Sequence, residues 1–148
     1  MKKYIGFKML EADPLTLGVY NELRGWTIPK DEDPKREGYR VIYPDGYVSW
    51  SPKEAFEKAY MQVSDNNTIT VENVEAFISA TETYLVGNKS TMVMATLANG
   101  YVIIETSSCV DPANYNEEIG KKICMDKIKD KVWALLGFLL QTAKDGIR

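Results

Sequence analysis

The chain of 148 residues is long enough for one ordinary domain or two small modules, and too short for a large multidomain enzyme. Its composition, 45% hydrophobic and 26% charged, is that of a globular protein. A net charge of −3 excludes a strongly basic protein held to nucleic acid by bulk electrostatics, so no nucleic-acid polymer is expected as a partner.

The chain has no histidine, which excludes Ser-His-Asp and Cys-His catalysis and removes the commonest zinc ligand. Its two cysteines, Cys109 and Cys124, form no CxxC pair, so neither a metal site nor a disulfide framework is predicted. No cofactor-binding loop or acid–base pair is found, and we expect no cofactor and no enzymatic activity. The sequence lacks a long apolar run and a signal-peptide pattern, which predicts a cytoplasmic protein without membrane contact.

The first part of the chain predicts a small module that contains a hairpin and helices. Ser51-Pro-Lys-Glu54 matches a capping box with proline at the first helical position, and it predicts a helix through Tyr60. The aromatic side chains of this part are interpreted as a small core, with base stacking as the alternative. The other predicted elements are a strand over 4–9, a helix over 15–23 that ends at Gly25, a charged loop over 29–38 and a β-hairpin over 39–50.

A polar stretch at residues 64–68 marks the predicted boundary between an N-terminal module, 1–63, and a C-terminal α+β domain, 66–148. Beyond it, the apolar spacing favours a short helix over 71–78. Alternating residues then predict strands over 83–86, 91–97 and 101–104, with a hairpin turn at Asn99-Gly100. The predicted fold class is therefore α+β, with an antiparallel meander packed on one long helix.

The long helix is expected to begin at Asp111-Pro112, since aspartate caps helices and proline suits their first position. Its apolar stripe is wider than a three-stranded sheet hides, which predicts a homo-oligomer interface as a second use of this surface. The predicted stripe comprises Ile119, Ile123, Ile128, Val132, Leu135 and Leu139, widened by Trp133, Leu136 and Leu140.

The start of this helix is the candidate anion site. We expect unpaired N–H groups after Asp111 and the hydroxyls of Thr106, Ser107 and Ser108 to form an edge that favours anions, with ordinary helix capping as the alternative. Lys121 and Lys122 follow within a few turns and are candidate phosphate ligands. Asn99 and Tyr101 are further candidates, as a polar edge and a ring able to stack on an adenine; the alternative is that they are plain turn and core residues.

Cys109 precedes the same predicted helix start, where the helix dipole lowers a thiol pKa and favours a nucleophile. Without a histidine base, and with apolar neighbours in the sequence, a buried structural cysteine is the preferred interpretation.

Three stretches carry a pattern that resembles a family of small tailed-phage and prophage proteins. They are Asn99-Gly-Tyr-Val102, residues 107–120 (Ser-Ser-Cys-Val-Asp-Pro-Ala-Asn-Tyr-Asn-Glu-Glu-Ile-Gly) and residues 133–140 (Trp-Ala-Leu-Leu-Gly-Phe-Leu-Leu). This C-terminal half resembles the first class of Thoeris anti-defence proteins. The N-terminal part resembles a leader module that precedes several prophage accessory domains.

The resemblance implies an oligomeric protein of the bacterial host cytoplasm that binds and sequesters a cyclic nucleotide-like immune signal without cleaving it. Basic residues at the start of the last helix are expected to meet the phosphates, and the matching positions here are Lys121 and Met125. The alternative function is a phage accessory protein that inhibits a host defence protein by direct contact. In that case the acidic loop Asp31-Glu-Asp33 and the aromatic module would form the recognition surface.

Overall fold

The computed structural model describes all residues from Met1 to Arg148 and has the predicted α+β class, with helices and two separate antiparallel three-stranded sheets. The chain forms two compact units: unit 1 comprises Met1–Gln62 with Thr142–Arg148, and unit 2 comprises Val63–Gln141. The predicted domains, 1–63 and 66–148, stay a prediction, because this division does not test whether either segment folds alone.

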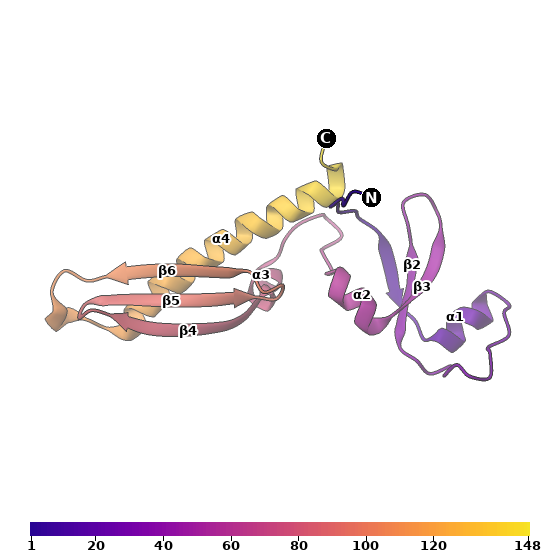
Figure 1. The fold of residues 1–148 in the computed structure, drawn as a ribbon, viewed down its shortest axis with the longest axis horizontal. Helices are drawn as coiled ribbons and strands as arrows, with labels where there is room; N and C mark the ends of the chain where they lie inside the picture. Colours follow the sequence, from indigo (N-terminus) through magenta and orange to yellow (C-terminus); the bar gives the residue numbers. More distant parts are fainter. The chain divides into compact units, whose positions relative to one another are not determined.

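Unit 1 contains a short sheet and two one- to two-turn helices (Figure 1). Its strands follow the order β1-β2-β3, and each neighbouring pair is antiparallel. The elements are β1 (Glu11–Pro14), α1 (Leu17–Leu23), β2 (Gly38–Ile42), β3 (Val48–Pro52) and α2 (Lys53–Ala59). The predicted hairpin is confirmed: Gly46 adopts a φ of 88° in its turn, and Tyr43 N–H donates to the carbonyl of Tyr47 at 2.9 Å.

Two local predictions in unit 1 are wrong. The strand predicted over 4–9 does not form, because a strand needs a partner and β2 pairs instead with residues 11–14, placing Glu11 opposite Ile42. The capping box at Ser51 is also absent. Ser51 still pairs with Tyr39 in the sheet, so the helix begins later, at Lys53, with Pro52 as its N-cap.

The aromatic side chains of unit 1 contribute to its packing, as the sequence predicted. Tyr39 and Phe56 stack at 4.2 Å between ring centroids, and Phe56 stacks on Tyr60 at 4.9 Å. The indole N–H of Trp50 donates to the carbonyl of Leu15 at 2.7 Å. A Cβ on Gly38 would lie 2.2 Å from the Trp50 ring, so only glycine fits where this ring crosses the sheet.

Unit 2 is a three-stranded antiparallel sheet of order β4-β5-β6, with a long helix along one face (Figure 1). Its elements are α3 (Val71–Phe77), β4 (Ile78–Val86), β5 (Ser90–Leu97), β6 (Val102–Ser108), the 3₁₀ turn η1 (Pro112–Asn114) and α4 (Glu117–Asp145). Thr70 and Asn73 form a reciprocal capping box that starts α3. The predicted meander, hairpin turn and long C-terminal helix are confirmed.

The core of unit 2 lies between β5 and α4. Every second residue of β5 is buried: Thr91, Val93, Ala95 and Leu97. The matching face of α4 is buried at every fourth residue: Gly120, Cys124, Ile128, Val132 and Leu136. A spacing of four advances about 40° around a helix per step, so this stripe runs obliquely along α4, as packing against a twisted sheet requires.

The predicted apolar stripe of α4 is therefore wrong in part. Ile128, Val132 and Leu136 face the core, whereas Ile119, Ile123 and Leu135 are 61%, 41% and 41% exposed. The predicted stripe combined residues from the buried and the exposed sides of α4. The buried side contains Gly120 and Cys124, which the search for large apolar residues left out.

The predicted start of α4 is also wrong. Asp111 caps only the short turn η1, and α4 begins at Glu117, where the Asn116 side chain accepts a hydrogen bond from Ile119 N–H at 3.1 Å. Tyr115 interrupts the helical backbone with a ψ of 130°, and its hydroxyl accepts a hydrogen bond from Thr91 at 3.2 Å. This side-chain contact with β5 separates the two helical segments.

Gly120 is the position at which α4 approaches the sheet most closely. A Cβ there would lie 2.1 Å from Oγ1 of the buried Thr91, whereas a Cβ on Gly137 of the same helix would meet nothing within 4 Å. We expect Gly120→Ala to destabilise the protein by about 2 kcal/mol through overpacking. Gly137→Ala, the matched control, should stabilise it by about 1 kcal/mol through helix propensity. Urea unfolding of both variants measures these changes, and equal shifts would contradict the assigned contact.

Candidate functional site

The predicted site residues of unit 2 lie at two opposite ends of strand β6. Asn99 and Tyr101 flank the turn before it, where Asn99 Oδ1 accepts a hydrogen bond from Tyr101 N–H at 3.0 Å and the Tyr101 side chain is 58% exposed. Thr106, Ser107 and Ser108 form its last three residues. At ~3.4 Å per residue the two groups lie roughly 20 Å apart along the strand. One copy of the chain does not bring them together.

The hydroxyls at the end of β6 divide between the two faces of the sheet. Ser107 pairs with the buried Thr91 in the sheet register, so its side chain is on the α4 face. Thr106 and Ser108 are on the opposite face, where Ser108 Oγ lies 2.7 Å from Ser90 Oγ. The candidate hydroxyls on the open side of the sheet are therefore those of Ser90, Thr106 and Ser108.

Lys121 and Lys122 are exposed on α4, on a different side of the helix from the β6 hydroxyls. The side of α4 that meets β6 is marked by Lys127, whose ammonium donates to the carbonyl of Thr106 at 2.8 Å, and by Lys131, which pairs with Glu105. Lys121 and Lys122 lie about 120° and 140° around the helix from Lys127. Lys122 instead shares a side with Lys129, seven residues later, which lies 3.7 Å from Glu75 of α3.

Lys127 and Lys131 are the basic residues that sequence reasoning missed. Their spacing of four places them on one side of α4, and each lies three residues after a buried residue of the core stripe, Cys124 or Ile128. Identifying the buried stripe correctly would therefore have placed these two lysines at the edge of the sheet.

The predicted supply of unpaired N–H groups after Asp111 is absent. Ala113 N–H donates to Asp111 Oδ1 at 2.9 Å, and the N–H groups of Asn114 and Tyr115 donate to carbonyls within the turn. The first turn of α4 also carries two carboxylates, Glu117 and Glu118, whose negative charge offsets the positive end of the helix dipole. The N–H groups of residues 113–115, which follow Asp111-Pro112, are therefore satisfied within the turn and are not available to an anion.

The sheet face that points away from α4 is apolar and uncovered within unit 2. We call it the open face. Its exposed large apolar residues are Tyr84, Val86, Val102 and Ile104, which are 44%, 47%, 45% and 52% exposed. Met92 and Met94 of the central strand lie between them, half-buried. Its charged residue is Glu82, which accepts a hydrogen bond from the Tyr84 hydroxyl, and this bond is the main cause of a raised Tyr84 pKa.

The two cysteines occupy different environments. Cys124 is fully buried in the core stripe, and burial is the main cause that raises the pKa of its thiol. Cys109 is only half-buried and donates to the carbonyl of Asp111 at 3.2 Å, so the prediction of a buried structural residue is wrong for Cys109. Its position in a connecting turn after β6, rather than in a strand or helix, leaves it outside the core.

These features describe an α+β protein whose second unit presents an uncovered sheet face, on which apolar side chains surround Glu82 and hydroxyl side chains lie at the end of β6. Residues 69–144, just over half of the chain, match the model of the phage protein (N4 Gp49/phage Sf6 gene 66) family. The chain belongs to this family of phage proteins. No curated protein and no solved structure matches it.

No helix of the structure, α4 included, combines the length and the apolar composition that crossing a bilayer requires.

The burial difference between the two thiols predicts their reactivity. At pH 8 we expect one thiol per chain, that of Cys109, to react rapidly with Ellman's reagent in the folded protein, and both to react in denaturant. Cys109→Ser should remove the rapid phase, and Cys124→Ser should leave it unchanged. Rapid reaction of Cys124 in the native protein would contradict the assigned core.

Burial also makes the free energy of unfolding depend on the ionisation of Cys124. Because the pKa of the Cys124 thiol is raised on folding, the stability that the neutral thiol contributes should be lost as the pH rises above the ordinary thiol range.

Proposed function

We propose that the protein is a phage counter-defence protein that binds a cyclic nucleotide-type immune signal, such as a cyclic ADP-ribose isomer or a cyclic oligonucleotide, and sequesters it without cleavage. It would act as a homo-oligomer in the bacterial cytoplasm. Membership of a phage protein family supports the phage origin of this role. The resemblance of residues 99–140 to Thoeris anti-defence proteins supports the ligand class.

The observation that carries the proposal is the division of the candidate residues between the two ends of strand β6, which borders one uncovered sheet face. A pair of copies related by a two-fold axis presents the same surface to each other, so that a residue i of one copy meets residue j of the other, and the reverse. If the open faces pair with their strands reversed, the turn that carries Asn99 in one copy lies beside Thr106 and Ser108 of the partner. Tyr101 is opposite the buried Leu97 and so on the α4 side of the sheet, which places its exposed ring at the rim of this site. Each pair of copies then has two equivalent sites, which a single copy lacks.

Such a composite site has suitable chemistry for a cyclic nucleotide. Tyr101 offers an exposed ring for stacking, Asn99 offers an amide, and Thr106 and Ser108 offer hydroxyl donors for phosphate oxygens. Lys127 donates to the backbone carbonyl of Thr106, which holds its ammonium at the edge of the sheet near this end of β6. Lys121 and Lys122 add exposed positive charge at the same end of unit 2, since Gly120 contacts Thr91 there. Sequestration needs only binding by such groups, and not a catalytic acid or base.

Burial of apolar surface supports the oligomer. The open face covers three strands of up to nine residues. At ~4.8 Å between strands and ~3.4 Å per residue, its flat extent is about 400 Å² per copy before side-chain relief is counted. This area lies within the roughly 300–600 Å² that the largest exposed patch of a monomer covers, and it is about half of the ~800 Å² per partner that specific interfaces bury. The exposed side chains of Ile119, Ile123 and Trp133 on α4 offer further surface for larger assemblies.

Binding is tested by isothermal titration against a panel of cyclic ADP-ribose isomers and cyclic di- and trinucleotides. To compete with a host receptor, a sequestering protein needs a Kd near the nanomolar range, about −12 kcal/mol. We expect one ligand to bind at this level and to be recovered chemically intact when the protein is denatured. No heat with any member of the panel, or recovery of a cleaved ligand, would contradict the proposal.

The oligomer is tested by Ile104→Glu in the centre of the open face. Two buried carboxylates facing each other are costly to desolvate, so we expect this variant to become monomeric and to lose ligand binding while it stays folded. Val71→Glu, at an exposed position on α3 outside both the open face and the apolar stripe of α4, is the matched control and should retain both the pairing and the binding. Light scattering coupled to gel filtration gives the mass. A monomeric wild-type protein at 100 µM, or an unchanged mass for Ile104→Glu, would exclude this interface.

A further inference from the structure

Unit 1 contains a cleft that the proposed function does not use. It lies between α1 and the β2–β3 hairpin and has a volume of about 500 Å³, within the usual range for small-molecule sites. Its walls combine two arginines with aromatic and aliphatic side chains. The lining residues are Tyr20, Leu23 and Arg24 from α1 and its end, Arg40 from β2, and Gly46, Tyr47 and Val48 from the hairpin. We call it the arginine cleft.

Arg24 is held in place without a carboxylate partner. One guanidinium N–H donates to the Tyr20 hydroxyl at 2.6 Å, and the guanidinium carbon lies 3.5 Å from the ring centroid of Trp26. None of the four ion pairs in the structure includes Arg24. A stacked guanidinium is already fixed, so it loses little further side-chain freedom when a ligand binds. Its remaining N–H groups keep the planar arrangement that donates two parallel hydrogen bonds to a carboxylate or phosphate.

Arg40 is only partly satisfied. Its Nη2 lies 2.7 Å from Asp13 Oδ2, and its buried Nε has no acceptor. The cleft lining therefore holds two guanidinium groups, of which Asp13 neutralises one. A buried donor without an acceptor is unfavourable, which favours any rearrangement that supplies one. The charge balance of the arginine cleft favours a ligand with one or two negative charges.

Exposed apolar side chains lie beside the two arginines of the arginine cleft. Leu23, Tyr47 and Val48 are 65%, 64% and 37% exposed beside the two arginines. The Tyr47 ring stacks on Tyr43 at 5.8 Å, and the ammonium of Lys8 lies 4.7 Å from the Tyr43 ring centroid. Rings backed in this way form a surface on which a planar group can lie.

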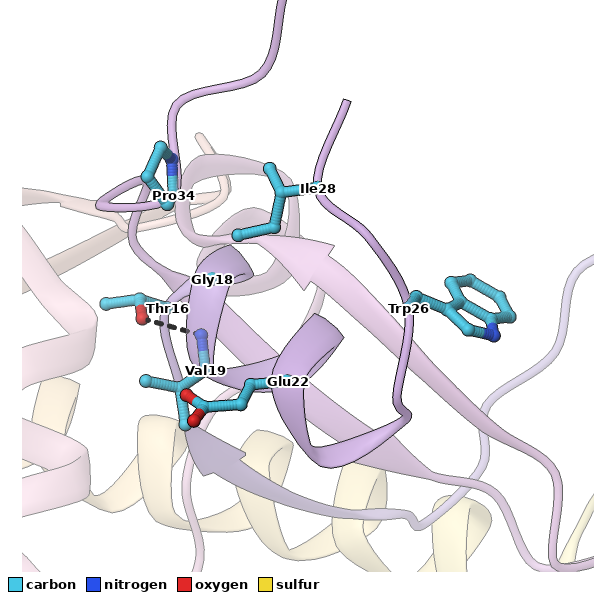
Figure 2. A pocket seen from close by; sticks show the side chains of 7 residues that line it. All are labelled: Thr16, Gly18, Val19, Glu22, Trp26, Ile28 and Pro34. Atoms are coloured by element: carbon cyan, nitrogen blue, oxygen red, sulfur yellow. Dashed lines mark hydrogen bonds between the residues drawn. The ribbon is translucent and has the colours of Figure 1, made fainter. Parts of the chain in front are cut away.

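A second cleft of unit 1, about 510 Å³ in volume, provides a contrast (Figure 2). The only charged group among its lining residues is the carboxylate of Glu22, and the Trp26 ring points away from the other lining side chains. An anion would be repelled there. The positive charge of α1 is directed to the arginine cleft, because Arg24 and Glu22 lie on different sides of this short helix.

We propose that the arginine cleft binds a small anion that carries a flat apolar group, with a phosphate or carboxylate accepting from Arg24 and Arg40 and the flat group lying against Tyr47 and Val48. Aromatic phosphates of nucleoside-monophosphate size and aromatic carboxylates share this chemistry. The site belongs to unit 1 alone, so it stands independently of the sequestering function assigned to unit 2.

The test is a titration of the full chain, followed by ¹⁵N NMR, with adenosine 5′-monophosphate, phenyl phosphate, benzoate and uncharged adenosine. We expect the anionic probes to shift the amide signals of Leu23, Tyr47 and Val48, and adenosine to bind at least tenfold more weakly. The ratio of the phenyl phosphate and benzoate affinities distinguishes the two anion types.

Arg24→Gln should weaken the anionic probes at least tenfold, and Arg24→Lys should have an intermediate effect because it keeps the charge but loses the fork. The matched control is Arg36→Gln, which removes the same charge from a residue outside the cleft that lies over the Trp50 ring at 5.8 Å. Melting curves establish that all three variants are folded. If Arg24→Gln alone unfolds, Arg24→Lys and the map of shifted amides still decide the question.

Several outcomes would overturn the proposal. Equal weakening by Arg24→Gln and Arg36→Gln would indicate non-specific charge attraction. Shifts confined to β6 and α4 would place binding in unit 2 and leave the arginine cleft without a ligand. Saturation by an acidic peptide without a response to any small anion would indicate a protein-docking surface. Binding of the probes should persist in Ile104→Glu, so a failure of the unit 2 proposal remains distinguishable.

Discussion

The close approach of Gly120 to Thr91 determines the geometry of unit 2. Without a side chain on Gly120, the start of α4 reaches the central strand, and Cys124 one turn later donates to the carbonyl of Thr91 at 3.7 Å. From this contact the buried stripe advances through Ile128, Val132 and Leu136. The rotation of α4 is therefore fixed at its first turns, and with it the side on which each lysine lies. Lys127 and Lys131 meet β6, and Lys129 meets α3.

The same packing leaves the sheet with one covered face. A single helix covers the α4 side of β5, and alternation of side chains along the strands then places Met92, Met94 and Ile104 on the side that no element of unit 2 covers. Apolar residues on both faces are typical of a strand that is buried on both faces. Because α4 covers only one face of the sheet, a cover for the other face has to come from outside unit 2. The oligomer and the composite site are proposed from this one constraint, since the covering copy also supplies the missing end of the site.

Sequence patterns predicted the elements whose signals are local. The alternation of β5, the Asn99-Gly100 turn and the apolar content of α4 each follow from neighbouring residues, and the structure contains all three. The patterns failed where a distant residue decides. Tyr115, where η1 ends, makes a hydroxyl contact with Thr91 of β5, and Ser51 is in a strand paired with Tyr39. The position of Lys121 and Lys122 relative to the β6 hydroxyls depends on the rotation of α4 about its axis. Gly120 and Cys124 fix this rotation, and a count of large apolar residues includes neither of them.

A net charge of −3 says little about small anions, because the two candidate sites depend on local charge and on how firmly it is held. A nucleic-acid polymer contacts many phosphates, and its affinity grows with the number of cations that meet them. A small ligand meets only one or two cations, so its affinity depends on their preorganisation. Arg24 is fixed between a tyrosine hydroxyl and an indole ring, and Lys127 is fixed by a strand carbonyl. The Lys121 ammonium makes no hydrogen bond or ion pair, so Lys121 would lose more side-chain freedom on binding. By this criterion Lys127 is a better candidate than Lys121 for the phosphate contact in unit 2. The groups that hold a cation in position matter more for binding than how close the cation lies to the start of α4.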